Sequence, residues 1–198
     1  DLDLTLEGDA IKLARALVKK YGGDLTIHEK FFTATWTPQS SNSPILDLIS
    51  ARRETYASPG ALPTVTKSTL DDDLRRRDFT INAMAIRVDG DYFGELYDPL
   101  HGQNDIEKKS IRVLHPKSFV DDPTRIFRAV RYAERYGFTV EPETLKLVND
   151  ESRKVLSDLS GERLRHEFDL IFDEPNPSAM LKQLSELDVF QSIHDQLQ

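Results

Sequence analysis

Apolar and polar positions recur with clear periods along the first half of the chain. Residues 1–6 alternate strictly between a polar residue and leucine, which predicts a strand with one half-buried face. Residues 9–21 place apolar side chains at helical spacing and end at Gly22-Gly23, so we predict a helix there. Apolar runs predict further strands at 25–27, 31–36 and 45–50, with a polar turn over 37–44.

The pattern changes in the second half of the chain. Residues 55–70 hold two prolines and a glycine and show no period, which indicates a long loop. Helices are expected at 70–77 and 80–85. Asp89-Gly90 between 86–88 and 92–96 predicts a hairpin. From about residue 116 only helices are expected, at 122–137, 141–149, 160–173 and 177–187. The fold class is therefore α+β, with a mixed domain over 1–114 and a helical one over 115–198.

Composition narrows the protein class. The 198 residues have a formal net charge of −8 and are 38% hydrophobic, which is typical of a globular protein. No apolar run reaches the length of a membrane span, and the first ten residues do not resemble a secretion signal. The chain has no cysteine, which excludes disulfides and thiolate metal sites and fits a cytoplasmic protein. Because it begins at Asp1 and not at Met, we expect a piece of a longer chain. Its oligomeric state is not readable from these features.

Three aspartates suggest a metal site. Asp1 and Asp3 share one face of the first strand, with their carboxylates about 6–7 Å apart, and that separation suits two Mg²⁺ ions. Asp47 interrupts an apolar strand, where a charge needs a partner or a metal. The alternatives remain open here: a solvated strand face for the first pair, and an ion pair with Arg52 or Arg53 for Asp47.

Residues 75–83 combine three arginines with Asp78, Thr80 and Asn82. Guanidinium groups suit phosphate oxygens, whereas Asp and Asn suit ribose hydroxyls. A solvated helix end, with Asp78 or Thr80 capping the next helix, explains the same residues without any ligand.

A basic helix is expected after Asp122-Pro123. Its arginines at 125, 128, 131 and 135 fall in one stripe on a helical wheel, and its apolar residues fall on the other side. Residues 107–136 hold eight Lys or Arg against four Asp or Glu within an acidic chain. A local excess of positive charge in a chain of negative net charge is typical of a surface that binds polyphosphate or RNA. Asp122 before a proline is also an ordinary helix cap.

Together, in this order, these motifs resemble the class II tRNA nucleotidyltransferase and bacterial poly(A) polymerase family. The segments that resemble it are Asp1–Leu4, Ala51–Tyr56, Arg76–Ala83, Asp98–Ile106, Asp121–Arg125 and Ser160–Leu164 with Glu167-Phe168. The resemblance covers nearly the whole chain. It implies a nucleotidyltransferase head similar to that of DNA polymerase beta, followed by a helical neck and the start of a body. It also implies a Gly-Gly-x-Val-Arg-Asp segment upstream, so the head is expected to be incomplete at its N-terminal end, and more body and tail downstream.

The same resemblance implies a reaction. Asp1 and Asp3 would hold catalytic Mg²⁺, with Asp47 as a third carboxylate, while an RNA 3′-hydroxyl attacks the α-phosphate of CTP or ATP and pyrophosphate leaves. Asp78 would bind the ribose with Arg77 and Asn82 in support. The base would pair with Asp122 and Arg125, and Arg128 and Arg131 would lie toward the triphosphate.

The implied substrates are the 3′ end of tRNA and a nucleoside triphosphate, with no membrane partner. Addition of CCA, CC or A alone, and poly(A) synthesis, stay open. The segment from Ala51 through Tyr56 to Pro63 favours the branch of partial CC- or A-adding enzymes. The alternative from another class is a non-catalytic RNA-binding remnant, against which the Asp1 and Asp3 pair argues.

Overall fold

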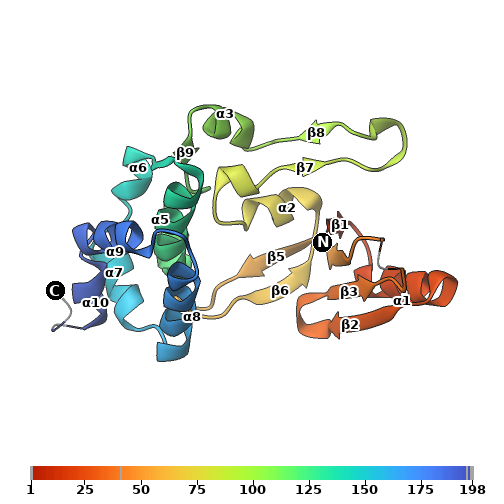
Figure 1. Cartoon of the computed structure of the whole chain (residues 1–198), viewed down its shortest axis with the longest axis horizontal. Coiled ribbons are helices and arrows are strands. Elements are labelled where there is room, and N and C mark those ends of the chain that lie inside the picture. Colours follow the sequence, from red (N-terminus) through yellow and green to blue (C-terminus); the bar gives the residue numbers. More distant parts are fainter. Residues whose placement is uncertain (1, 41, 195, 197–198) are drawn as a thin grey trace. The chain divides into compact units, whose positions relative to one another are not determined.

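The computed structural model describes residues 2–40, 42–194 and 196. The chain folds as two compact units, one of Asp1–Thr55 with Pro63–Arg76 and one of Tyr56–Leu62 with Arg77–Gln198. Figure 1 labels their elements. The predicted division into domains 1–114 and 115–198 stays a prediction.

A four-stranded sheet forms the centre of the first unit. Its order is β1 (Leu2–Leu6), β4 (Leu46–Ser50), β3 (Thr33–Thr37) and β2 (Asp24–His28), with β1 parallel to β4 and the other pairs antiparallel. A 3-10 turn, η1 (Glu29–Phe31), joins β2 to β3. This confirms a mixed sheet with helices, as the alternating pattern predicts.

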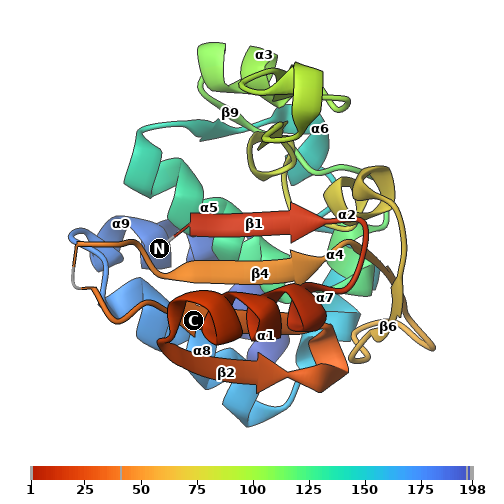
Figure 2. The same cartoon turned by 90° about the vertical axis from the view of Figure 1, so that its right-hand side faces the viewer.

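Helix α1 (Ala10–Tyr21) packs on one face of this sheet (Figure 2). It begins where the Asp9 side chain accepts a hydrogen bond from the Lys12 amide at 2.9 Å, and it ends at Gly22, whose φ is +70°. The core between helix and sheet contains Ala10, Ala14, Ala34, Trp36 and Leu48. Because side chains alternate along a strand, odd-numbered residues of β1 and β4 lie on the opposite face.

The predicted loop over 55–70 is wrong in part, because it contains a strand. Arg52–Thr55 (β5) and Thr64–Lys67 (β6) pair antiparallel, so β6 lies inside that segment. Helix α2 (Leu70–Arg75) follows, and the Thr69 hydroxyl caps it by accepting from the Asp72 amide.

The second unit begins with short elements. These are η2 (Thr80–Asn82), β7 (Ala85–Ile86), η3 (Gly90–Tyr92), β8 (Leu96–Tyr97), α3 (Gly102–Glu107) and β9 (Ser110–Ile111). The predicted hairpin over 86–96 is present as β7 and β8. The predicted helix over 80–85 is wrong, because only the 3-10 turn η2 forms there.

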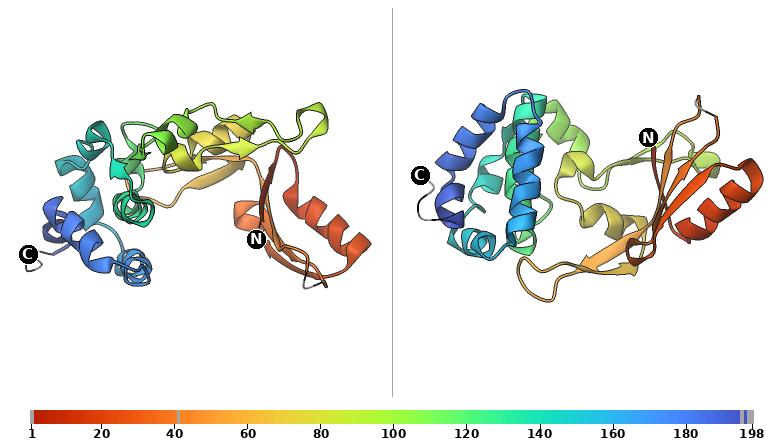
Figure 3. Two further views of the ribbon diagram at one scale, coloured as in Figure 1. Left: turned by 45° about the horizontal axis from the view of Figure 1, so that its top comes forward. Right: turned by 60° about the horizontal axis from the view of Figure 1, so that its bottom comes forward.

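Helices then dominate. They are α4 (Ser118–Asp121), α5 (Thr124–Tyr136), α6 (Pro142–Leu145), α7 (Asp150–Ser157), α8 (Gly161–Phe172), α9 (Pro177–Glu186) and α10 (Val189–Ile193). Figure 3 shows them gathered around α5, drawn in green and blue. Phe127, Val130, Leu156, Ile171 and Leu184 form the centre of their shared core. None of the helices over the described residues has both the length and the hydropathy to cross a bilayer.

Two expectations for this region are wrong. The strand β10 (Thr139–Val140) pairs in parallel with β9, so the region after residue 116 is not helical throughout. The helix expected at 141–149 stops at Leu145, and a new helix, α7, starts after Asn149. The Asn149 side chain and Ser152 form a reciprocal capping box, which fixes this start.

Candidate functional site

The carboxylates of Asp3 and Asp47 lie on the sheet face opposite α1. Asp3 of β1 is the direct partner of Asp47 of β4 in the parallel register, and Thr35 of β3 is the partner of Asp47 on the other side. The Thr35 hydroxyl donates to Asp47 Oδ1 at 2.6 Å. Asp3 is exposed and Asp47 half-buried. Asp1 lies outside the described residues.

These oxygens fit a hard divalent cation. Adjacent strands lie about 4.8 Å apart, so two carboxylates in register on one face can share an ion. Oxygen ligands are those that Mg²⁺ prefers. A single hydroxyl donor leaves Asp47 with further lone pairs for a ligand. Among the described residues, no group of three or more acidic, His or Cys side chains is placed to hold a metal.

Asp78 forms the second cluster, in the second unit, and is almost fully buried. Its Oδ1 accepts from the Phe79 amide at 2.8 Å and from Asn82 Nδ2 at 3.0 Å. Its Oδ2 accepts from Arg128 Nε at 2.8 Å and Nη2 at 2.5 Å. Arg77 Nη1 donates to the Asn82 carbonyl at 3.3 Å. Three residues that the sequence nominates for the ribose therefore lie together, and Arg128 joins them.

Asp122 lies between α4 and α5 and is about one quarter exposed. Its Oδ1 accepts from the Thr124 amide at 3.1 Å and from the Thr124 hydroxyl at 2.7 Å. It thus closes the turn before α5, as the capping alternative expects. Arg163 Nη2 of α8 also donates to Oδ1 at 2.9 Å. Capping leaves Oδ2 of Asp122 without a hydrogen bond among the described residues, so capping and ligand binding are compatible.

The expected open row of arginines along α5 is wrong. Arg125 and Arg131 are both about 94% buried, and Arg125 Nη1 donates to the Ser118 hydroxyl at 2.8 Å. The Arg131 guanidinium lies 5.4 Å from the Tyr132 ring centroid. Arg128 is paired with Asp78, and Arg135 with Glu174. The contact with Asp78 uses Nε and Nη2 of Arg128, so Nη1 remains as the donor with which Arg128 can contact a phosphate.

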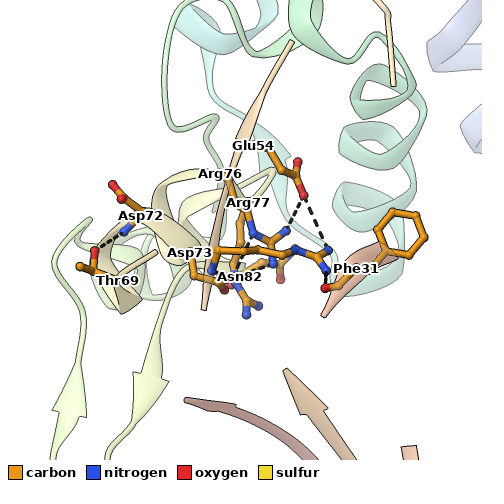
Figure 4. Close-up of polar contacts among 9 residues, drawn as sticks. Phe31, Glu54, Thr69, Asp72, Asp73, Arg76, Arg77 and Asn82 are labelled. Carbon is orange, nitrogen blue, oxygen red and sulfur yellow. Dashed lines mark hydrogen bonds and ion pairs between the residues drawn. The ribbon is translucent and has the colours of Figure 1, made fainter. Parts of the chain in front are cut away.

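A third cluster, in the first unit, holds Arg76 in place. Figure 4 shows Arg76 beside Glu54 and Asp73. Arg76 Nη1 lies 3.0 Å from Glu54 Oε1, and Arg76 Nη2 lies 2.9 Å from Oδ1 of the fully buried Asp73. Arg52 also pairs with Glu54 at 3.7 Å. This network fastens β5 to the end of α2, so Arg76, the middle one of the three arginines before Asp78, has a structural role.

The contacts of Arg163 and Glu167 were not predicted, although both residues belong to motifs that the sequence singles out. Arg163 Nη1 donates to the Gly60 carbonyl at 2.7 Å while its Nη2 donates to Asp122. Glu167 is 5% exposed, and its Oε2 has no hydrogen-bond partner among the described residues. Burial raises the pKa of the Glu167 carboxyl, and the nearby Arg128 and Arg131 partly oppose this rise. Their place in the motif Ser160–Leu164 with Glu167-Phe168 was the available signal.

Comparison with known proteins assigns both halves of the chain to one kind of enzyme. Residues 1–112 match the poly A polymerase head domain, and residues 137–198 match the probable RNA- and SrmB-binding site of polymerase A.

Curated relatives are similar along almost the whole chain. An A-adding tRNA nucleotidyltransferase of Halalkalibacterium halodurans is 42% identical over 98% of this chain and 45% of its own length. Another of Geobacter sulfurreducens is 40% identical over 100% of this chain and 22% of its own. A CC-adding enzyme of Deinococcus radiodurans is 38% identical over 89% of this chain and 46% of its own. The chain thus spans less than half the length of these relatives.

Solved structures agree with the fold. An apo CCA-adding enzyme superposes with a TM-score of 0.92 and 38% identity, over 99% of this chain and 46% of the other. A tRNA nucleotidyltransferase complexed with a primer tRNA and an incoming ATP analog gives a TM-score of 0.83 and 35% identity, over 99% and 54%. With the ordered motifs and this fold, the chain belongs to the class II tRNA nucleotidyltransferase and bacterial poly(A) polymerase family.

Proposed function

We propose that the protein is a Mg²⁺-dependent tRNA nucleotidyltransferase that adds AMP to the 3′ end of tRNA. The observation that supports it most is the register pair of Asp3 and Asp47, with Thr35 bonded to Asp47, on the sheet face that α1 leaves free. Two exposed or half-exposed carboxylates in register repel each other unless a cation lies between them. A chain without a metal-dependent reaction has no physical reason to keep this arrangement.

Asp3 and Asp47, together with Asp1, are the residues proposed to hold Mg²⁺. When bound, the ion would supply charge neutralisation for the triphosphate and activation of the attacking hydroxyl. In the reaction, the RNA 3′-oxygen forms a bond to the α-phosphorus of the nucleotide as the bond to pyrophosphate breaks, and the hydroxyl proton is lost to solvent.

The proposed nucleotide contacts are in the second unit. Asp78, supported by Arg77 and Asn82, would accept from the ribose hydroxyl, and Asp122 with Arg125 would pair with the base edge. Arg163 holds the Asp122 carboxylate at one oxygen, which leaves the other free to accept from an exocyclic amine. Arg128 and Arg131 stay proposed contacts of the triphosphate.

Addition of A alone is proposed because two A-adding relatives match longer stretches at higher identity than the CC-adding one. The CC-adding activity is the second candidate, since 38% identity over 177 residues is also close similarity. A cytoplasmic location stays a prediction.

Defined tRNA ends test the proposal. Transcripts that stop before CCA, after C and after CC are each incubated with Mg²⁺ and either ATP or CTP, and gels resolve the products. We expect one A on the CC end and no C on the shorter ends. Growth by C alone would favour the CC-adding activity, and addition of all three nucleotides a complete CCA enzyme. Long A ladders on unrelated RNA would favour a poly(A) polymerase, and no addition to any end an RNA-binding remnant.

A further inference from the structure

A polar pocket lies beside the segment Asp98–Ile106, a motif of the sequence analysis to which the proposed function gives no role. The pocket measures about 550 Å³ and is lined by α3, β9, β10 and the start of α6, all within the second unit. Figures 1 and 2 show α3, β9 and α6 next to one another. Its volume is within the range of small-ligand sites.

The lining is rich in hydrogen-bond donors. The donors are His101, Asn104, Lys108, Ser110, Arg112 and Thr139. Lys108 is exposed, and its ammonium has no ion-pair partner within the described part of the chain. Lysine, arginine, hydroxyl and amide donors are the groups with which proteins contact the phosphates and sugars of nucleic acids.

The two carboxylates of the lining are already engaged. Asp105 Oδ2 accepts from the Thr80 hydroxyl at 2.6 Å and from Arg112 Nε at 2.8 Å. Glu141 Oε2 accepts from the Thr144 hydroxyl at 2.8 Å. Asp105 therefore fixes and compensates the Arg112 guanidinium, one-third exposed, so the remaining charges of the lining are the Lys108 ammonium and the Glu141 carboxylate. Lys108 is exposed and Glu141 is half-buried, so the ammonium is the charge more open to a ligand.

The backbone on both sides of α3 is strained. His101 precedes the helix with φ +61° and Lys109 follows it with φ +52°. Residues other than glycine adopt this left-handed region at a cost, and such strain concentrates at functional sites. Two of the four residues of this kind among those the structure describes thus flank the helix that lines the pocket.

We propose that this pocket binds a backbone phosphate of the RNA substrate, with Lys108 as the principal cation and the hydroxyls of Ser110 and Thr139 as further donors. The inference rests on the proposed function for the identity of the RNA as tRNA. A free mononucleotide offers the same phosphate, so the test must separate the two sources.

The test measures tRNA binding by the whole chain in filter-binding titrations across a KCl series, without nucleotide. The variants are Lys108→Gln, Lys108→Arg and, as a matched control, Lys19→Gln, which removes an exposed lysine of α1 in the first unit. Circular dichroism melting verifies that each variant folds. In parallel, melting with AMP tests the free nucleotide.

We expect Lys108→Gln to weaken tRNA binding about threefold to tenfold at moderate salt and to reduce the slope of log K against log salt by about one. Lys108→Arg should retain the wild-type slope, and Lys19→Gln should leave both values unchanged. An unchanged affinity and slope in Lys108→Gln would overturn the proposal. So would an AMP-induced rise in Tm that needs Lys108 while tRNA affinity does not. A wild type that binds tRNA through Lys108 but adds no nucleotide overturns only the proposed function.

Discussion

At the scale of single residues, Asp3 allows the most direct test of the metal assignment. Asp3→Asn removes a charge from an exposed position that faces Asp47 across two parallel strands. We expect nucleotide addition to fall by about two to three orders of magnitude, with the melting temperature unchanged or slightly raised because the repulsion between carboxylates is removed. Primer extension on the CC-ended tRNA measures the loss.

Asp24→Asn is the matched control, because Asp24 is an exposed carboxylate at the start of β2 in the same sheet. Its activity should equal that of the wild type. Turnover by Asp3→Asn at the control rate would remove Asp3 from the metal site.

Arg163 tests how Asp122 is held. Arg163→Gln removes one charge-assisted hydrogen bond to Asp122 and one to the Gly60 carbonyl, both at a partly buried position. We expect a loss of about 1–2 kcal/mol in the free energy of unfolding. We also expect a raised KM for ATP, because Asp122 loses a fixed orientation. Urea titration and steady-state kinetics measure the two effects.

Arg165→Gln separates this effect from a general loss of charge on α8. Arg165 is 83% exposed and its contact with Asp169 measures 3.6 Å, so its loss should cost under about 0.5 kcal/mol. If both variants lose the same stability, the contacts of Arg163 do not stabilise the protein specifically.

At the scale of elements, two glycines with the same substitution should behave oppositely. A Cβ on Gly102, at the start of α3, would lie 2.2 Å from the Thr80 carbonyl oxygen, so α3 and η2 would have to separate. A Cβ on Gly161, at the start of α8, meets nothing within 4 Å. We expect Gly102→Ala to cost about 3 kcal/mol and Gly161→Ala to be neutral or to stabilise by up to about 1 kcal/mol. Thermal and urea unfolding of both variants measure these changes, and equal effects would contradict the close approach of α3 to η2.

Helices and strands are predicted correctly where a periodic pattern continues over many residues and the capping residues are adjacent to it in the sequence. Asp9, Gly22 and Ser160 mark the ends of α1 and the beginning of α8 in the sequence, and the structure uses each of them as a cap. The strands β6 and β10 escaped prediction because they have four and two residues and exist by pairing with β5 and β9. Such pairing is decided by tertiary structure, not by local pattern.

The charge partners of α5 also depend on tertiary structure and could not be predicted from local pattern. The helical wheel predicts correctly that its arginines lie on one side, but the partners of that side are remote in sequence. Asp78 lies 50 residues before Arg128, and Glu174 lies 39 residues after Arg135. Two of the four arginines of the stripe are therefore paired with carboxylates, a result that sequence charge alone could not give.

At the scale of the whole molecule, the sequence predicts which residues are candidates and the fold decides which of them meet. Asp3 and Asp47 are 44 positions apart, and only the parallel pairing of β1 with β4 places them opposite each other. The grouping of Asp78 with Asn82 was predictable from their spacing. The bond of Arg163 to Asp122 was not, because it spans 41 positions between separate helices.

Glu167 makes the stability of the whole protein depend on pH. Burial raises the pKa of its carboxyl above the value in the unfolded chain, against the opposing effect of Arg128 and Arg131. Between those two values the native state binds more protons than the unfolded state. The contribution of Glu167 to the free energy of unfolding therefore decreases as pH rises through this window.

Glu167→Gln removes this titration while keeping the shape of the side chain. The difference in the free energy of unfolding, variant minus wild type, should become more positive as pH rises from about 4 to about 7, as measured by urea titrations at several pH values. Glu186→Gln, on the exposed side of α9, should show a difference within about 0.5 kcal/mol throughout. If the Glu167→Gln difference instead becomes more negative toward neutral pH, attraction to Arg128 and Arg131 outweighs burial. The buried carboxylate would then stabilise the helical core in its charged form.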